Sequence, residues 1–353
     1  MNRIYHVHQF TPSVAAGDGV SQGLFYTQQL LRELGYVSTI YANHIDDALK
    51  GRVLHIDEYQ ASAHNILLYH HSIGHEHHDL IMGFPDHRVL VYHNITPSHF
   101  FKNVPHLKQA CDQGREQLAH ALPYIEASYA DSDYNADELI SLGYREPQVI
   151  PILVDVDQCL SRAEHASRSA FDKEHFNILF VGRIVSNKNQ HQLVDVLYSI
   201  KQQETAKPVK LYLAGGVSEP DYMDFVNAHI NALGLEDSVE VLGKVPDAEL
   251  YDCMCSADLF LCLSEHEGFC MPILESICCG APVLAYQAGG IATTLGEAGL
   301  LTYKASSTIA DTICDYIKHP EKLTELHRAQ FAHLQQFRRE NLMDKLQKVL
   351  EQF

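Results

Sequence analysis

The chain alternates short runs of β-branched and aromatic residues with segments of helical periodicity, and this alternation occurs twice. Such a pattern is typical of parallel α/β sheets, because a helix must return the chain before each new parallel strand. A polar stretch from Asp155 to about Glu174 has no clean apolar period and separates the two halves. A length of 353 residues suffices for two domains with a core each. We therefore expect two doubly wound parallel-sheet domains, with any ligand at the carboxyl ends of strands or between the domains.

The elements of the first half follow from its apolar runs. A helical stripe predicts a helix over Ser21–Leu34 that ends at Gly35. Strands are predicted at Arg3–Val7, Tyr36–Tyr41, Asn65–Tyr69, Arg88–Tyr92, Tyr124–Ala127 and Gln148–Val154.

The second half repeats the pattern more strongly. Strands are predicted at Phe176–Val181, Val209–Ala214, Val239–Leu242, Asp258–Leu263 and Pro282–Tyr286. Helices are predicted at Asn189–Gln203, Asp221–Leu233, Asp247–Ser256 and Pro272–Cys279, and the tail from Thr308 to Phe353 is helical.

Charge and composition exclude several classes of protein. The 26 Lys+Arg and 45 Asp+Glu give a net charge of −19 without any basic block, which argues against a nucleic-acid partner and against electrostatic attachment to anionic lipid. The 9 cysteines lie mostly in apolar runs without a Cys-x-x-Cys pair, which favours free thiols over a zinc ribbon. The sequence has neither a signal-like start nor a run of about 18 apolar residues. We expect a cytoplasmic protein with at most peripheral contact with the inner face of the membrane.

A glycine-containing loop precedes the first helix. The loop Thr11–Val20 contains Gly17-Asp-Gly19, and amides at such a helix start bind anions. Its spacing to Gly23 is one residue too long for the dinucleotide fingerprint, which argues against a nicotinamide or flavin enzyme. A plain turn remains an equal alternative.

Two cations follow the first strand of the second half, in Gly182-Arg183 and Asn187-Lys188. They lie five residues apart at a strand exit, where a diphosphate binds in open α/β sheets. The alternative is a pair of solvated basic residues, which we consider the weaker explanation in a chain this acidic.

The strongest motif runs from Ser264 to Ser276. Its amides from Gly268 to Met271 precede a helix with Pro272 in the first turn, and Glu267 and Glu275 bracket the turn. Along a continuous helix these carboxylates would be roughly 12 Å apart, more than a glycosidase pair needs. Hydrogen bonding to sugar or ribose hydroxyls fits better.

Taken in order, these motifs resemble the retaining glycosyltransferases of family 4. The matching segments are Gly182-Arg183…Asn187-Lys188, Leu213-Ala-Gly215-Gly216, Glu267-x7-Glu275, Gly280-Ala-Pro-Val283 and Ala288-Gly289-Gly290, with weaker matches at Ala130-Asp-Ser132-Asp and Val149–Asp157. The resemblance implies the GT-B fold, with two Rossmann-like domains facing a central cleft and a C-terminal helix crossing back. It implies an acceptor-side domain over residues 1–160, a donor domain over 171–335, and a helix over 336–353 that packs on the N-terminal domain.

The resemblance also implies roles for individual residues. Arg183 and Lys188 would neutralise the donor diphosphate and the leaving nucleotide, and Glu275 would hold the ribose hydroxyls. Glu267 would orient the donor sugar and pyrophosphate. The remaining donor-binding candidates are Gly17, Gly19, Gly182, Gly215, Gly268, Phe269, Cys270 and Met271. The family more often has glycine where this chain has Cys270, which puts the identity of the sugar in question.

Histidines gather between His70 and His93. A metal set of His71, His75, His77 and His78 is conceivable, but a cleft loop is favoured because no Cys or carboxylate framework completes the set. His93 matches the family position beside the donor sugar and is our first sugar-facing candidate, with His71 and Asn94 as candidates for the acceptor side. Asp155-Val-Asp157 is interpreted as structural, and no metal is expected.

The implied reaction is the retaining transfer of a hexose from GDP-mannose or a UDP-hexose to a hydroxyl of a saccharide or lipid-linked glycan, in surface polysaccharide biosynthesis. The nucleotide sugar is a co-substrate, and no cofactor is implied. The alternatives are a GT-B phosphorylase or epimerase and a non-catalytic nucleotide-sugar binder.

Overall fold

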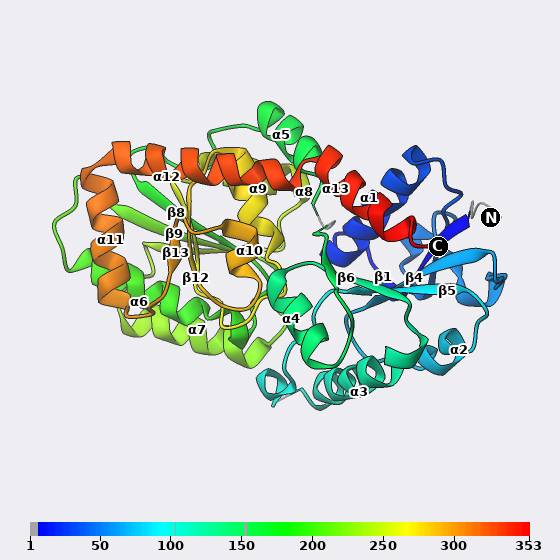
Figure 1. The fold of residues 1–353 in the computed structure, drawn as a ribbon. Helices are drawn as coiled ribbons and strands as arrows, with labels where there is room; N and C mark the ends of the chain where they lie inside the picture. Colours follow the sequence, from blue (N-terminus) through cyan, green and yellow to red (C-terminus); the bar gives the residue numbers. More distant parts are fainter. Residues whose placement is uncertain (1–5, 103, 152–153) are drawn as a thin grey trace. The chain divides into compact units, whose positions relative to one another are not determined.

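The structure, a computed structural model, describes residues 6–102, 104–151 and 154–353. They form two compact units, drawn in Figure 1. Unit 1 comprises Met1–Asp155 and Gln336–Phe353, and unit 2 comprises Val156–Gln335. Within the described residues, no helix combines the length and the apolar character that a bilayer crossing requires.

Unit 1 is built on one parallel sheet. Its described residues contribute seven strands in the order β3-β2-β1-β4-β5-β6-β7. The strands are β1 His6–Val14, β2 Ile40–Ile45, β3 Leu54–His55, β4 Asn65–His71, β5 His87–Tyr92, β6 Ala127–Ala130 and β7 Gln148–Val149. The helices are α1 Gly19–Glu33, α2 His78–Met82, α3 Pro105–Ala121, α4 Asp133–Ser141 and α13 Arg339–Leu350.

Strand alternation in unit 1 creates two separate apolar faces. Leu67 and Tyr69 of β4 pack in a cluster with residues of α3 and α4. Ile66 and Leu68 of the same strand pack in a second cluster with residues of α1 and α13. Because successive side chains of a strand point to opposite faces, His70 belongs to the α1 side and His71 to the α3 side.

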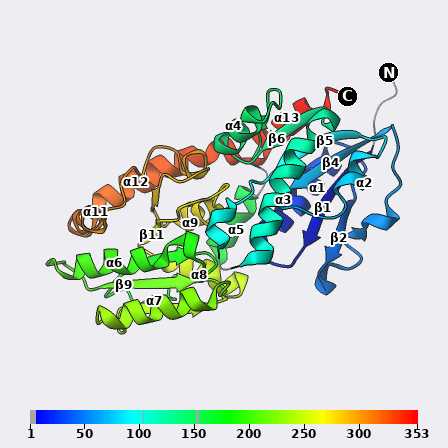
Figure 2. The ribbon, with the colours of Figure 1, turned by 90° about the horizontal axis from the view of Figure 1, so that it is seen from below.

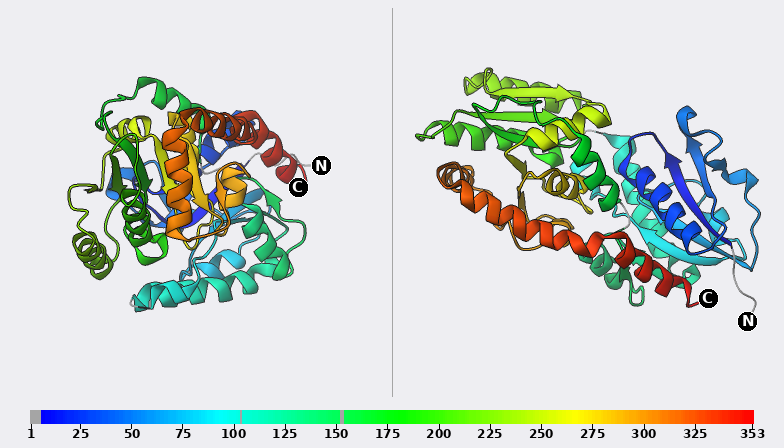
Figure 3. Two further views of the ribbon diagram at one scale, coloured as in Figure 1. Left: turned by 90° about the vertical axis from the view of Figure 1, so that its left-hand side faces the viewer. Right: turned by 90° about the horizontal axis from the view of Figure 1, so that it is seen from above.

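Helix α13 packs on unit 1 although it is the last helix of the chain. It buries Leu342, Leu346 and Val349 in the cluster shared with α1. An ion pair joins Arg339 to Glu33 at the end of α1. Figure 3 (right) shows α13 in red beside the blue α1.

Unit 2 has its own parallel sheet, in the order β10-β9-β8-β11-β12-β13. Its strands are β8 Phe176–Val181, β9 Val209–Ala214, β10 Val239–Gly243, β11 Leu259–Cys262, β12 Val283–Tyr286 and β13 Leu300–Leu301. Its helices are α5 Val156–His165, α6 Gln190–Lys201, α7 Pro220–Ala232, α8 Asp247–Ser256, α9 Met271–Cys279, α10 Ile291–Leu295, α11 Ser306–Lys318 and α12 Pro320–His333. Figures 1 and 2 show α6 and α7 together on the opposite side of this sheet from α9.

Four expectations need correction. Strand β1 runs to Val14, so the expected loop Thr11–Val20 shrinks to four residues before α1. Strand β2 begins at Ile40 rather than Tyr36, and β6 begins at Ala127 rather than Tyr124. The polar stretch after Asp155 begins with α5, which buries Cys159 against Tyr251 of α8.

Two predicted strands touch residues that the structure does not describe. Residues 3–5 of the predicted strand Arg3–Val7, and residues 152–153 of the predicted strand Gln148–Val154, lie outside the described residues. Within the described part of the latter, β7 covers only Gln148–Val149.

Candidate functional site

The site in unit 2 rests on a close approach of two strand ends. Gly215 follows β9 with φ +149°, and a Cβ there would lie 1.9 Å from the carbonyl oxygen of Gly182, which follows β8. Ile184 donates its N–H to the carbonyl of Gly216 at 2.9 Å, which keeps the two chain segments in register beyond the strands. Only glycine fits at position 215, so this contact fixes the path of the chain that leads to Arg183 and Lys188.

The two predicted cations have different surroundings. Arg183 is exposed, and within the described chain its guanidinium forms no hydrogen bond or ion pair. Lys188 ends a short 3₁₀ helix over Ser186–Lys188, and its Nζ donates to Glu267 Oε1 at 2.6 Å. Burial works to lower the pKa of Lys188, but the neighbouring Glu267 carboxylate outweighs burial and raises the pKa above its usual value.

Glu267 is held by a loop that packs against the chain after β12. Gly290 donates its N–H to the Glu267 carbonyl at 2.8 Å, and a Cβ on Gly289 would lie 2.2 Å from that same oxygen. The Lys188 and Glu267 side chains are only 17% and 8% exposed. The ion pair is therefore largely shielded from solvent, where its charges interact strongly.

The residues after Glu267 form the turn into α9. Phe269 is buried, and its carbonyl accepts a hydrogen bond from the Thr294 hydroxyl. Cys270 has φ +68° and directly precedes α9, which begins at Met271. Glycine is usual in this left-handed conformation, so Cys270 maintains a strained backbone beside Glu267.

Cys262, which is not among the predicted site residues, lies in the same place. Its Sγ, the Cys270 Sγ and a Glu267 carboxylate oxygen all lie within 4.8 Å of one another. A hydrogen bond with Cys270 lowers the pKa of Cys262. The Lys188 ammonium beside Glu267 opposes the binding of a cation to this group.

Glu275 lies on α9 and is half-buried. Burial raises its pKa to about 7, although the positive charge of Arg162 on α5 works in the opposite direction. At neutral pH this carboxyl group is therefore divided between its protonated and ionised forms. Perturbed carboxyl groups of this kind are frequent at binding sites.

In unit 1, His93 lies between two buried partners at the carboxyl ends of neighbouring strands. Its Nδ1 is 2.8 Å from Asp131 Oδ2, and its Nε2 is 2.8 Å from His70 Nδ1. Because a carboxylate can only accept, His93 Nδ1 carries a proton. His70 Nε2 is buried without a hydrogen-bond partner in the described residues. Burial, and then the nearby His93, hold the pKa of His70 well below its usual value.

The acceptor-side candidates His71 and Asn94 both form hydrogen bonds within unit 1. His71 is fully buried, with Nε2 2.8 Å from the Gly114 carbonyl and Nδ1 3.0 Å from the Tyr69 hydroxyl. Asn94 donates to Asn135 Oδ1 at 3.0 Å. The expectation that His71 faces an acceptor is therefore corrected, since neither ring nitrogen is available.

Near Gly17 and Gly19, aspartate carboxylates already accept hydrogen bonds from the backbone amides that could otherwise bind an anion. Asp18 caps α1 by accepting the Ser21 N–H at 3.0 Å, and Asp46 accepts the Ala16 N–H at 3.3 Å. Gly17 adopts φ +78°, which explains a glycine there without a ligand. These negative charges oppose a phosphate at the start of α1.

Sequence reasoning missed His70 and Asp131 as partners of His93. The sequence does hold a signal, because each of these residues lies at or just after the end of an apolar run. Strand β4 ends in His70 and His71, His93 follows β5, and Asp131 follows β6. Parallel strands that are neighbours bring their carboxyl ends together, but the strand order had to be known first.

Comparison with known families gives a match over unit 2. Residues 161–332 match the family described as "Glycosyl transferases group 1". A D-inositol 3-phosphate glycosyltransferase of Gordonia bronchialis is 26% identical over 230 residues, which cover 61% of this chain and 50% of the relative. The mannosylfructose-phosphate synthase of Agrobacterium fabrum is 28% identical over 156 residues, covering 43% of this chain and 33% of the relative. The matched segments thus span about half or less of the length of these two relatives. The first is a glycosyltransferase by name and the second a sugar-phosphate synthase.

Solved structures share the fold over the whole length. A glycosyltransferase from Rickettsia africae aligns with a TM-score of 0.75 and 16% identity, covering 100% of this chain and 99% of that one. Anabaena HepE, solved in complex with UDP and glucose, aligns with a TM-score of 0.68 and 18% identity, covering 99% and 100%. The expected GT-B fold class, with two Rossmann-like parallel-sheet domains and a helical C-terminus, is confirmed.

Proposed function

We propose that this protein is a retaining glycosyltransferase that moves a hexosyl group from a nucleoside diphosphate sugar to a hydroxyl of a saccharide or lipid-linked acceptor. The observation that carries the proposal is the shielded Lys188–Glu267 ion pair after β8, inside the segment that matches the group 1 glycosyltransferases. The pair offers a cation for a phosphate and a carboxylate for a sugar hydroxyl. We further propose a role in surface polysaccharide biosynthesis.

The leaving diphosphate would be stabilised by Arg183 and Lys188. The Arg183 guanidinium is exposed and unpaired in the described chain, so it is available for bidentate binding of a phosphate. The Lys188 ammonium has three N–H donors, and Glu267 takes one of them. Charge that develops on the leaving group would meet these two cations, and one such electrostatic contact contributes about 10²–10³ in rate.

The carboxylates would bind rather than attack. Glu267 is tied to Lys188 and would accept a hydroxyl of the donor sugar, while Glu275 in its ionised form would accept the ribose hydroxyls. Neither is proposed as a covalent nucleophile. We propose front-face attack by the acceptor hydroxyl, with the leaving phosphate taking its proton.

His93 would reach a sugar hydroxyl only by exchanging one partner. Asp131 holds Nδ1, so the nitrogen available for a ligand is Nε2, which His70 contacts in this structure. A hydroxyl that replaces His70 would meet a ring whose orientation Asp131 already fixes. Asp131 is therefore a positioning residue for His93, and His70 is the partner that the hydroxyl displaces.

The donor is tested by a panel of nucleotide sugars. Because Anabaena HepE is solved with UDP and with UDP-glucose, we test UDP-hexoses first and GDP-mannose second. A donor that binds the folded protein raises the melting temperature with concentration. Transfer to saccharide acceptors is then followed by NMR, which reports whether the anomeric configuration is retained.

Arg183→Ala separates activity from stability best, because the Arg183 side chain forms no hydrogen bond or ion pair with the described residues and its loss should not destabilise the fold. We expect kcat/KM to fall by about 100-fold or more with an unchanged melting temperature of the free protein. Lys173→Ala, which removes an exposed lysine before β8, is the control and should change neither kcat/KM nor the melting temperature.

Absence of donor binding contradicts the proposal. Dependence on inorganic phosphate, epimerisation of the donor, or binding without transfer would favour a phosphorylase, an epimerase or a binding protein instead.

A further inference from the structure

Three histidines of unit 1 converge on one buried hydroxyl group. The Tyr69 oxygen lies 3.0 Å from His71 Nδ1, 2.8 Å from His75 Nε2 and 3.0 Å from His78 Nδ1. Tyr69 is on β4, and all four side chains are buried. The histidine set considered from the sequence therefore does not surround an empty centre.

The hydrogen bonds fix where each proton lies. His71 Nε2 must carry a proton because it faces the Gly114 carbonyl at 2.8 Å, so His71 Nδ1 accepts the Tyr69 proton. The Tyr69 oxygen, having donated its only proton, accepts from His75 Nε2 and His78 Nδ1. His78 is left with an unprotonated Nε2.

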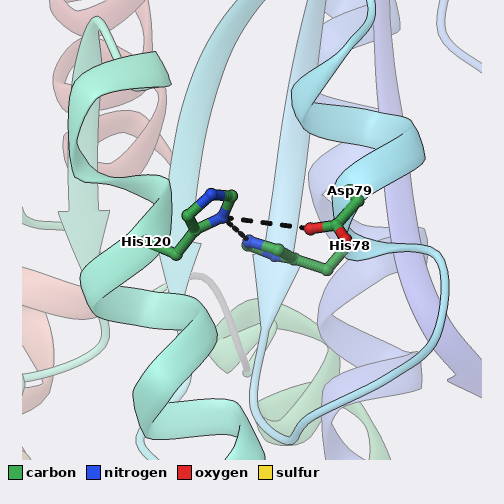
Figure 4. Close-up of side chains that lie close together, drawn as sticks. All are labelled: His78, Asp79 and His120. Carbon is green, nitrogen blue, oxygen red and sulfur yellow. Dashed lines mark hydrogen bonds and ion pairs between the residues drawn. The ribbon is translucent and has the colours of Figure 1, made fainter.

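That nitrogen faces His120, and His120 in turn faces Asp79, as Figure 4 shows. His78 Nε2 lies 3.0 Å from His120 Nδ1 at the end of α3, and His120 Nδ1 lies 4.0 Å from Asp79 Oδ1. The three atoms all lie within 4.8 Å of one another. The His120 and Asp79 side chains are 53% and 90% exposed, so the group is open to solvent on one side.

We propose that His78, Asp79 and His120 bind a divalent transition-metal cation, with Zn²⁺ as the best chemical match. Two imidazole nitrogens and a carboxylate oxygen suit Zn²⁺ better than Mg²⁺ or Ca²⁺, which prefer oxygen ligands alone. With Zn–N distances of about 2.0–2.1 Å, tetrahedral ligand nitrogens lie about 3.3 Å apart, close to the 3.0 Å between His78 and His120. A fourth position would remain for water.

The surroundings of His78 support metal binding beyond the ligand set itself. A metal-bound histidine almost always donates its other ring N–H to a fixed acceptor, and Tyr69 already accepts that of His78. His120 needs only to move its proton from Nδ1 to Nε2. The exposed Asp79 side chain, whose Oδ1 lies 4.0 Å from His120 Nδ1, needs to move about 0.7 Å closer to that nitrogen to reach the spacing of two tetrahedral ligands. The ion would join α2 to the last turn of α3.

The site is distinct from the proposed donor site. Its three ligands belong to unit 1, whereas Lys188, Glu267 and Glu275 belong to unit 2. Metal binding and sugar transfer can therefore succeed or fail independently of one another.

The test is a titration of the chelator-treated protein with Zn²⁺ by calorimetry and with Co²⁺ by absorption spectroscopy. Loss of an outer-shell partner alone typically weakens metal binding by about 10–100-fold. We therefore expect one site, which His120→Ala and Asp79→Asn, each of which removes a ligand, weaken by at least about 10-fold. Both substitutions are at exposed side chains and leave the buried Tyr69 network intact. His319→Ala removes a half-exposed histidine that also lies beside carboxylates, and should leave the affinity unchanged.

The Co²⁺ spectrum separates this site from the nine cysteines. A visible band of nitrogen and oxygen coordination that disappears in His120→Ala supports the proposal. A strong thiolate charge-transfer band would assign the ion to cysteines such as Cys262 and Cys270 and overturn it. Equal Zn²⁺ affinity of the wild type and His120→Ala, or absence of a stoichiometric site, would overturn it as well.

Discussion

At the scale of single residues, the Lys188–Glu267 pair combines a stabilising role with a proposed binding role. Both side chains are largely shielded, so each charge depends on the other. Loss of activity in a single variant would therefore not distinguish unfolding from loss of a ligand contact. Removing both charges together makes that distinction.

Lys188→Met leaves the Glu267 carboxylate without a counter-charge, and we expect it to lower the free energy of unfolding by about 3–5 kcal/mol. The double variant Lys188→Met/Glu267→Gln should recover most of that loss but should still bind UDP about 100-fold more weakly than the wild type. Urea unfolding and calorimetric titration with UDP measure the two effects. A double variant as unstable as Lys188→Met would refute the ion-pair account, and one that binds UDP normally would refute the assignment of the site.

Glu275 gives a pH-dependent prediction. Its folded-state pKa of about 7 exceeds the ordinary value of about 4.3, so the folded protein retains a proton that the unfolded chain loses. The wild type therefore loses stability as the pH rises from about 4.3 to about 7. Glu275→Gln removes this loss and should be more stable than the wild type at pH 8 by about 1–3 kcal/mol, allowing for partial exposure.

The same carboxyl group should control nucleotide affinity. If ribose hydroxyls donate to the ionised form, UDP affinity of the wild type rises with pH through about 7, while Glu275→Gln binds more weakly and without that dependence. Calorimetric titration with UDP at pH 6 and pH 8 measures these affinities. Glu236→Gln, which changes an exposed carboxyl group, is the control and should behave as the wild type. A pH profile shared by wild type and Glu275→Gln would rule out this role.

Sequence alone identified Lys188 and Glu267 but not their contact. They are 79 residues apart, and only the adjacency of β8 and β11 brings them together. His93 was likewise identified without Asp131 and His70, which lie 38 and 23 residues away. Local spacing marks a residue type at a strand end, but the partner depends on the strand order of the whole sheet.

At the scale of elements, the contact between the ends of β8 and β9 makes a prediction about neighbouring glycines. A Cβ on Gly215 would lie 1.9 Å from a backbone oxygen, while a Cβ on Gly216 would meet nothing within 4 Å. Gly215→Ala should lower the free energy of unfolding by more than about 2 kcal/mol, and Gly216→Ala should change it by about 0.5 kcal/mol or less. Chemical denaturation of both variants measures the difference. Equal effects would contradict the close approach.

Strand prediction succeeded where an apolar run has clear ends. The predicted bounds of β8 and β9 agree with the structure, because His175 and Gly182 flank the first run, and proline and glycine flank the second. The prediction was wrong for β2, which contains the polar residues Asn43 and His44. Those residues are in the strand because β1 extends to Val14 and pairs Ser13 with His44, a tertiary effect that the local pattern does not contain.

At the scale of the whole molecule, unit 1 is assembled from two distant segments of the chain. Leu346 of α13 is fully buried in the cluster shared with α1 and the sheet. Leu346→Ala should lower the free energy of unfolding by about 2–5 kcal/mol, and the exposed Gln347→Ala by about 0.5 kcal/mol or less. Hydrogen exchange should report the loss in unit 1 more than in unit 2. An equal loss in both units would show that α13 does not serve unit 1 specifically.

The discontinuity of unit 1 has a consequence for synthesis on the ribosome. Domains generally complete folding in the order in which they emerge, at about 5–20 residues per second. Here Val156–Gln335 emerges between the two segments of unit 1, so unit 2 can complete its fold first. For roughly 10–40 s the apolar surface formed by Ile66, Leu68 and Val89 therefore lacks the contacts that α13 later supplies. During this interval the nascent chain exposes apolar surface of an incomplete sheet, and a chaperone has that time in which to cover it.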